Sequence, residues 1–173
     1  METTGDKKVV CITGSVWTGS RAAPRHMLVK DGFLRPTWFT TGRPLTDAQY
    51  NHVSATQFHM ANADTKVLVH IEYGGSFIGV MRDDFEIAKA AAKQGVLVVG
   101  PPEIAAQLGV AIPEAFIFSL KDVDMDLSEH LDAANRSGQL HRVDVDVLEP
   151  GAWTEVHRSM VETIGLPVRG EAL

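Results

Sequence analysis

Short apolar runs rich in β-branched residues alternate along this chain with segments of helical period. The runs predict strands at residues 9–13, 34–39, 67–73, 77–80, 96–99, 115–120 and 143–147. Such alternation is typical of a parallel sheet wrapped by helices, and it disfavours a bundle or a sandwich. A Gly74-Gly75 turn joins two of the runs and predicts an antiparallel hairpin inserted in an α/β core.

The predicted helices are marked by residues that favour helix ends. They lie at residues 54–59, 84–94, 102–108, 128–136 and 153–164. Ser54 and Gln57 form a capping box at the start of the first helix. Acidic residues open the second helix, which is expected to end at Gly95. Pro102 suits the first turn of the third, which is expected to end before Gly109.

Composition narrows the class of protein. The chain has 173 residues, of which 45% are hydrophobic, and this is the size of a single globular domain. A net charge of -6 argues against a nucleic-acid partner, because binding to phosphate backbones needs a concentrated positive face. Cys11 is the single cysteine, so no disulfide forms within the chain. No apolar run is long enough to span a bilayer, and we expect a cytoplasmic protein without a membrane partner.

A degenerate phosphate-binding loop follows the first predicted strand. Gly14 and Gly19 keep the spacing of a Walker A loop, whose backbone amides cradle phosphates. Ser20 and Arg21 stand where that loop has its lysine and its Ser/Thr. Gly14, Gly19, Ser20 and Arg21 are therefore candidates for binding an anion. Trp17 is expected to fill part of the phosphate space, the alternative being that it stacks on a base.

Three further motifs follow the loop in a fixed order. They are Thr40-Thr41-Gly42-Arg43-Pro44, Tyr50-Asn51-His52-Val53-Ser54 and Gly75-Ser76-Phe77-Ile78-Gly79. With the loop, they make the chain resemble the guanylate kinase family from Val9 to about Leu120. The resemblance implies a P-loop nucleoside monophosphate kinase fold, with a parallel sheet, flanking helices and a small inserted antiparallel β subdomain. It implies one domain over residues 1–173, with a core of about 8–32 and 81–165 and an inserted acceptor-binding part of about 33–80.

The resemblance also implies an acceptor-side anion site. The arginines with which the family holds phosphate would fall at Gly42 and Leu45, and Arg43 lies one place from the first of them. Tyr50 stands at the position of a tyrosine that contacts the acceptor phosphate. Thr40, Thr41, Arg43 and Tyr50 are therefore the candidate ligand-binding residues on this side. The alternative is that Tyr50 only packs and that Arg43 is solvated.

The positions that would recognise guanine are degenerate. The guanine-reading carboxylate of the family would fall near Val69, and a small shift in register makes Glu72 the candidate instead. The family's phosphate-contacting tyrosine of the hairpin would fall at Ile78, and its guanine-contacting Ser/Thr would fall at Val80. Apolar side chains leave the polar edge of guanine unpaired, so GMP is not the expected acceptor. If the former cleft binds a partner instead, Val69, Ile78 and Val80 are predicted to give an apolar wall suited to a peptide or a hydrophobic metabolite.

Catalytic parts of the family are also reduced. The acid expected after the strand at 96–99 is absent or has moved to Glu103, and Arg136 is the candidate cation from a short lid, unless it is a solvated helix end. Arg21 and Arg136 are thus the candidate catalytic residues. Magnesium and ATP are implied as cofactors only if kinase activity is retained, and no metal ligands are predicted.

Two functional hypotheses follow. The first is a diverged guanylate kinase-like protein that binds a nucleotide or another phosphorylated small ligand, with ordinary transfer from ATP to GMP weak or absent. If it is an enzyme, it is a phosphotransferase with an atypical acceptor. The second is an inactive interaction module, a pseudoenzyme whose former nucleotide cleft binds a phosphorylated or apolar segment of a protein partner. The oligomeric state is left open.

Overall fold

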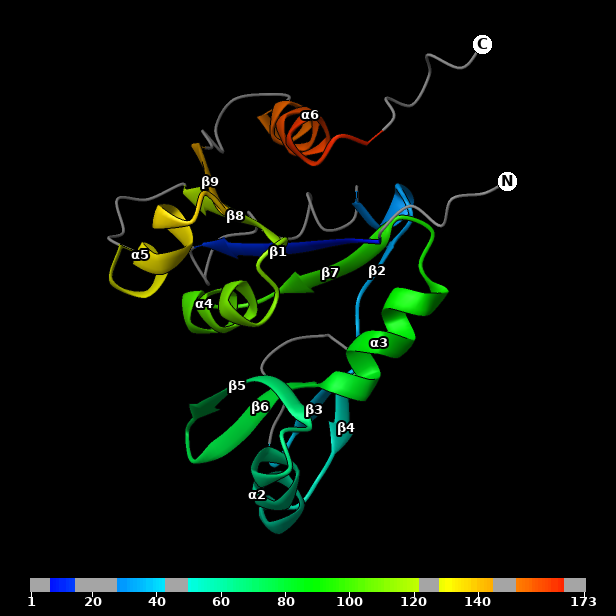
Figure 1. Ribbon diagram of the computed structural model, residues 1–173, viewed down its shortest axis with the longest axis vertical. Helices are drawn as coiled ribbons and strands as arrows, with labels where there is room; N and C mark the ends of the chain where they lie inside the picture. Colours follow the sequence, from blue (N-terminus) through cyan, green and yellow to red (C-terminus); the bar gives the residue numbers. More distant parts are fainter. Residues whose placement is uncertain (1–6, 15–27, 43–49, 122–127, 145–151, 167–173) are drawn as a thin grey trace.

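The computed structural model describes residues 7–14, 28–42, 50–121, 128–144 and 152–166. Two sheets and their helices form the fold (Figure 1). The strands are β1 (Lys8–Gly14), β2 (Phe33–Leu34), β3 (Trp38–Thr40), β4 (Tyr50–His52), β5 (Val67–Tyr73), β6 (Ser76–Met81), β7 (Gly95–Val99), β8 (Phe116–Lys121) and β9 (Leu140–Asp144). The helices are α2 (Ala55–Ala63), α3 (Arg82–Ala91), α4 (Pro102–Ala111), α5 (Ser128–Arg136) and α6 (Ala152–Ile164).

The core sheet has five strands in the order β2-β7-β1-β8-β9, and every neighbouring pair is parallel. Its central strands are apolar at nearly every position because both faces of the sheet are covered. In β1, Val9 and Cys11 pack on one face and Val10 and Ile12 on the other. The predicted α/β class with a parallel sheet is confirmed.

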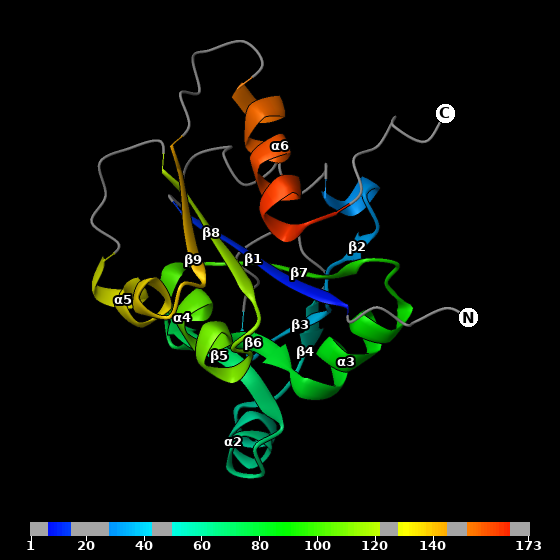
Figure 2. The same ribbon diagram turned by 45° about the horizontal axis from the view of Figure 1, so that its top comes forward.

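Helices lie on both faces of the core sheet. Figures 1 and 2 show α4 and α5 on one face and α6 on the other. The face with α4 and α5 buries Ile104, Leu108 and Leu131, and the opposite face buries Met160 of α6 against Phe118 of β8. Successive apolar side chains of a strand therefore pack alternately into two separate hydrophobic layers, one on each face of the sheet.

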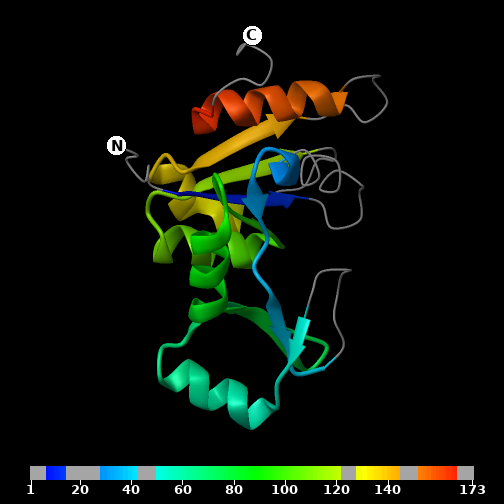
Figure 3. The same ribbon diagram turned by 90° about the vertical axis from the view of Figure 1, so that its right-hand side faces the viewer.

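The second sheet has four strands in the order β4-β3-β6-β5 and lies beyond α4 and α3, with α2 on its outer face (Figure 3). The β5–β6 pair is an antiparallel hairpin turned at Gly74 and Gly75, both of which have positive φ, so the predicted hairpin is confirmed. The sheet as a whole is mixed, because β3 and β4 are parallel. On its outer face the ring of Phe58 of α2 stacks on Phe77, with ring centroids 4.3 Å apart.

The strand predicted over residues 34–39 is divided between the two sheets. Phe33 and Leu34 pair with β7 in the core sheet, whereas β3 pairs with β4 and β6 in the second. Pro36 lies between them and has no amide hydrogen to donate to a ladder, so the chain crosses from one sheet to the other there. The segment belonging to the second sheet thus begins after Leu34.

Two helix ends differ from those predicted. Helix α3 ends at Ala91 and not at Gly95, because the backbone of Gln94 bonds to residues in the core: its amide donates to Gly32 and its carbonyl accepts from Lys8. Helix α4 runs past Gly109 to Ala111. A Cβ at Gly109 would lie 3.0 Å from Ile117 Cδ1, so the glycine permits close packing on β8. The capping box of Ser54 and Gln57 is formed as predicted, although α2 extends to Ala63.

Candidate functional site

The carboxyl ends of β1 and β8 meet at the place where the strand order reverses. Gly14 is paired with Leu120, and the chain leaves β1 toward β2 on one side but leaves β8 toward β9 on the other. Open α/β sheets bind their ligands at such a switch point. Gly14 is therefore well placed for an anion site. The predicted loop residues Gly19, Ser20 and Arg21, together with Trp17, lie outside the described residues.

Buried hydroxyl groups lie at this switch point. Thr13 precedes Gly14, is paired with Ser119 of β8 and is 0% exposed, while Ser119 is 4% exposed. Within the described parts of the chain, Thr13 Oγ1 is a buried side-chain oxygen that makes no hydrogen bond. Buried polar groups are almost always paired in folded proteins, which makes this hydroxyl an exception with a cost in stability.

The acceptor-side threonines lie beside the β3–β6 pair. The hydroxyl oxygen of Thr40 accepts a hydrogen bond of 3.1 Å from the Gly42 amide, and that of Thr41 accepts one of 2.8 Å from the Phe77 amide. Each hydroxyl keeps its own proton for donation. Thr40 is buried, however, and both oxygens already stabilise the local backbone.

Tyr50 shares one sheet face with Thr40. It is paired with Trp38, and Thr40 lies two residues beyond Trp38 in the same strand. The rings of Trp38 and Tyr50 have centroids 6.5 Å apart, and Tyr50 is half-buried against the main core. The structure thus brings Thr40 and Tyr50 to one face, while Arg43 lies outside the described residues.

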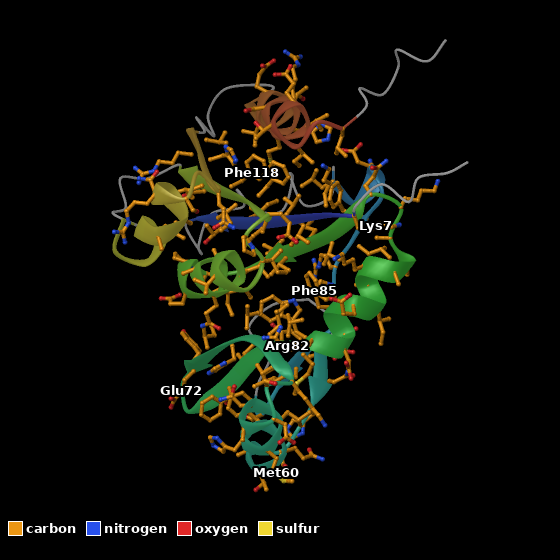
Figure 4. All side chains as sticks on the ribbon, in the orientation of Figure 1. Lys7, Met60, Glu72, Arg82, Phe85 and Phe118 are labelled. Carbon is orange, nitrogen blue, oxygen red and sulfur yellow. The ribbon has the colours of Figure 1, made fainter. Side chains whose placement is uncertain are left out.

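Glu72 lies apart from this group. It is exposed on β5, at the opposite edge of the second sheet from Tyr50, with β3 and β6 in between. Since neighbouring strands are about 4.8 Å apart, the two backbones are separated by roughly 14 Å. Figure 4 shows Glu72 at the outer side of the hairpin. Glu72 and Tyr50 are therefore not arranged around one small anion.

The predicted apolar wall is wrong, because its three side chains pack into the hydrophobic core between the second sheet and α4. Val69, Ile78 and Val80 are at most 1% exposed and belong to the same core cluster as Ile104 and Leu108 of α4. The second sheet packs directly on this helix. These three positions belong to the hydrophobic core, and their apolar character is explained by that packing.

Trp38 of the second sheet packs beside the carboxyl end of β7 in the core sheet. It is 6% exposed, and its Cη2 atom would lie 3.4 Å from a Cβ placed on Gly100, the residue after β7. Gly100 stands in the segment where an acid was expected, and the ring of Trp38 packs against it. Glu103, the alternative acid, is exposed in the first turn of α4.

A side-chain amide joins the second sheet to the core. The amide of His70 in β5 donates to Gln107 Oε1 at 2.8 Å, and Gln107 Nε2 donates to the carbonyl of His70 at 2.6 Å. Gln107 belongs to α4, so it binds the edge of β5 as a neighbouring strand would. Burial lowers the pKa of His70, whose ring contacts Phe58.

Gly42 and Arg136 are the remaining predicted positions within the described residues. A Cβ at Gly42 would lie 1.9 Å from Ser76 Oγ, so a larger residue at this position requires Ser76 to move. Arg136 is exposed in the last turn of α5. The described segments contain no group of three or more potential metal-ligating side chains and no helix long and apolar enough to cross a membrane.

A cavity of about 300 Å³ lies between α3, the end of α4 and the start of β5. Its lining consists of Leu68, Arg82, Phe85, Glu86, Lys89, Ala111, Ile112 and Glu114. Figure 4 labels Arg82 and Phe85 at this place. None of the predicted site residues that the structure describes, Gly14 included, lines this cavity.

Sequence reasoning missed Trp38, Gln107 and the Thr13–Ser119 pair. The polar positions inside otherwise apolar strands, Thr13 and Ser119, were a usable signal. Gln107 carried none, because a single amide on a helix has no pattern that indicates its partner.

The strand order and the inserted second sheet define an α/β fold of the nucleoside monophosphate kinase type. The crystal structure of guanylate kinase from Anaplasma phagocytophilum matches 91% of this chain and 86% of its own, with a TM-score of 0.59 and 12% sequence identity. A similarity at this identity shows the fold. No protein-family model matches the chain. No curated protein matches it in sequence.

Proposed function

We propose that this protein binds a nucleotide or another phosphorylated small ligand at the carboxyl ends of β1 and β8, and that ordinary transfer from ATP to GMP is weak or absent. The observation that supports the second part is the burial of apolar side chains at positions where the guanylate kinase resemblance implies polar contacts. Val69, Ile78 and Val80 are buried in the hydrophobic core, so none of them offers a hydrogen bond to guanine or to its phosphate.

The first part rests on the switch point. Gly14 ends the central parallel strand β1 there, and the chain leaves the neighbouring strand β8 toward the opposite side of the sheet. Because the chain carries a net charge of -6, anion binding at this place has to come from local donors. The hydroxyl groups of Thr13 and Ser119 are such donors.

Calorimetric titration with ATP, ADP, GMP, pyrophosphate and inorganic phosphate, each with and without magnesium, tests ligand binding. We expect at least one phosphate compound to bind and GMP alone not to bind. A coupled assay for ADP release in the presence of ATP and GMP is expected to give no turnover above the background without protein. Substantial GMP phosphorylation, or absence of binding by every phosphate compound, would contradict the proposal.

The acceptor-side residue is tested by Tyr50→Phe, which removes one hydroxyl and keeps the ring. If Tyr50 contacts the bound phosphate, affinity falls by roughly fivefold or more. Tyr73→Phe is the matched control, because Tyr73 is exposed at the turn of the hairpin. Equal affinities of the two variants would remove Tyr50 from the site.

The second candidate, an interaction module, is favoured by the burial of Val69, Ile78 and Val80, none of which offers a polar contact to a nucleotide acceptor. A phosphorylated partner segment is then the expected ligand, since the apolar side chains proposed for a hydrophobic segment are buried. Binding of phosphopeptides with no binding of free nucleotides would select this candidate over the first.

A further inference from the structure

Two hydroxyl groups lie side by side beneath the switch point. Cys11 and Ile117 point into the same hydrophobic layer from β1 and β8, and they are paired in register. Thr13 and Ser119 follow each of them by two residues and are also paired, so their side chains share that face. Parallel strands are about 4.8 Å apart, which allows both hydroxyls to reach a single group between them.

The burial of this pair is unusual for polar groups at the end of a sheet. Thr13 and Ser119 are 0% and 4% exposed, and Thr13 Oγ1 makes no hydrogen bond within the described segments. Valine has nearly the same shape as threonine and would fill this place without leaving a polar atom unpaired. The hydroxyl therefore serves no packing purpose that valine would not serve better.

We propose that Thr13 and Ser119 donate their hydroxyl protons to one phosphate group of the ligand bound at the carboxyl ends of β1 and β8. The inference rests on the proposed function and deepens it by naming side chains that select the ligand. Hydroxyls are neutral donors, so they bind an oxyanion without adding charge to a buried place. The pair thus supplies local donors to a protein whose net charge repels anions.

The test compares Thr13→Val and Ser119→Ala with the wild type, using calorimetric titration with ADP and with pyrophosphate. Each variant is expected to bind roughly tenfold more weakly, because a hydrogen bond to a charged group is lost. The melting temperature of unliganded Thr13→Val is expected to be equal to or higher than that of the wild type. Thr56→Val and Ser159→Ala are matched controls at exposed positions and are expected to bind as the wild type does.

Thr13→Ser is a control that distinguishes loss of the hydroxyl group from a folding defect caused by any substitution at this position. It keeps the hydroxyl and loses only a methyl group, so its affinity is expected to stay within about threefold of the wild type while Thr13→Val loses affinity. If the wild type binds ADP or pyrophosphate, and Thr13→Val and Ser119→Ala both bind it with the affinity of the wild type, the inference is overturned and the proposed function stands. A lower melting temperature of Thr13→Val with unchanged affinity assigns the hydroxyl a structural bond and also overturns it. If the wild type binds neither ADP nor pyrophosphate nor inorganic phosphate, both proposals fail.

Discussion

Replacing Gln107 by alanine is expected to loosen the second sheet from the core. The side chain makes two hydrogen bonds to the backbone of His70, of 2.8 and 2.6 Å, across 37 positions of sequence. Each bond contributes about 1 kcal/mol net, and the loss leaves two partly buried backbone groups of an edge strand without their protein partner. We expect the free energy of unfolding to fall by about 2 kcal/mol, which corresponds to a melting temperature lower by about 4–8 °C for a chain of this size.

Urea unfolding followed by circular dichroism measures this change, and hydrogen exchange at the His70 amide reports it locally. Val110→Ala is the control on the same helix, because Val110 is 76% exposed, and its effect is expected to stay within about 0.5 kcal/mol. Gln107→Glu keeps the acceptor for the His70 amide and loses the donor to the carbonyl, so it is expected to destabilise as well. A loss below about 0.5 kcal/mol for Gln107→Ala, with exchange of the His70 amide unchanged, would refute the reasoning.

Three further changes test other parts of the structure. Ser54→Ala removes the cap of α2 and is expected to cost about 1 kcal/mol in urea unfolding; an effect no larger than that of Thr56→Ala would contradict a formed capping box. His157→Ala removes a 2.5 Å contact from Nε2 to Asp31 Oδ2 that joins α6 to the core, and is expected to cost about 1 kcal/mol. Arg158→Ala, which breaks an exposed pair with Glu155, is expected to cost less, and equal losses would argue against a contribution from the partly buried His157–Asp31 contact. Burial lowers the pKa of His70 in the folded protein below its ordinary value of about 6.5. As the pH drops through 6.5, the His70 imidazole is therefore protonated more readily in the unfolded chain than in the folded one, and the free energy of unfolding falls. His70→Phe is expected to flatten this part of a plot of melting temperature against pH, and an unchanged slope would exclude His70 as its cause.

The parallel core was predictable because its strands are apolar on both faces and are separated by helical segments. The hairpin at Gly74 and Gly75 and the capping box at Ser54 were predictable because each depends on neighbours in sequence. Strand β4 was missed because Tyr50-Asn51-His52 is polar and lies at a sheet edge, where exposed side chains give no apolar signal. The end of α4 was predicted too early because Gly109 does not end the helix. A glycine stands there because the helix packs closely against Ile117, which the local sequence does not indicate.

Part of the candidate site was also predictable from the sequence, and part of it was not. The loop spacing that begins at Gly14 was visible in the sequence, and the structure places Gly14 at the switch point between β1 and β8. The sequence also shows that Val69, Ile78 and Val80 are apolar. It does not show whether these side chains face a ligand or the core, because both environments favour apolar residues.

Periodicity and turn residues thus determined by themselves that this is an α/β protein with an inserted hairpin, because these signals arise from contacts within one element or between neighbouring ones. Only the tertiary structure decided that the second sheet packs on α4 and is held by Gln107, and that Thr13 lies buried beside Ser119. Those facts depend on which distant elements meet, and in this fold they meet through single side chains that leave no repeating pattern in the sequence.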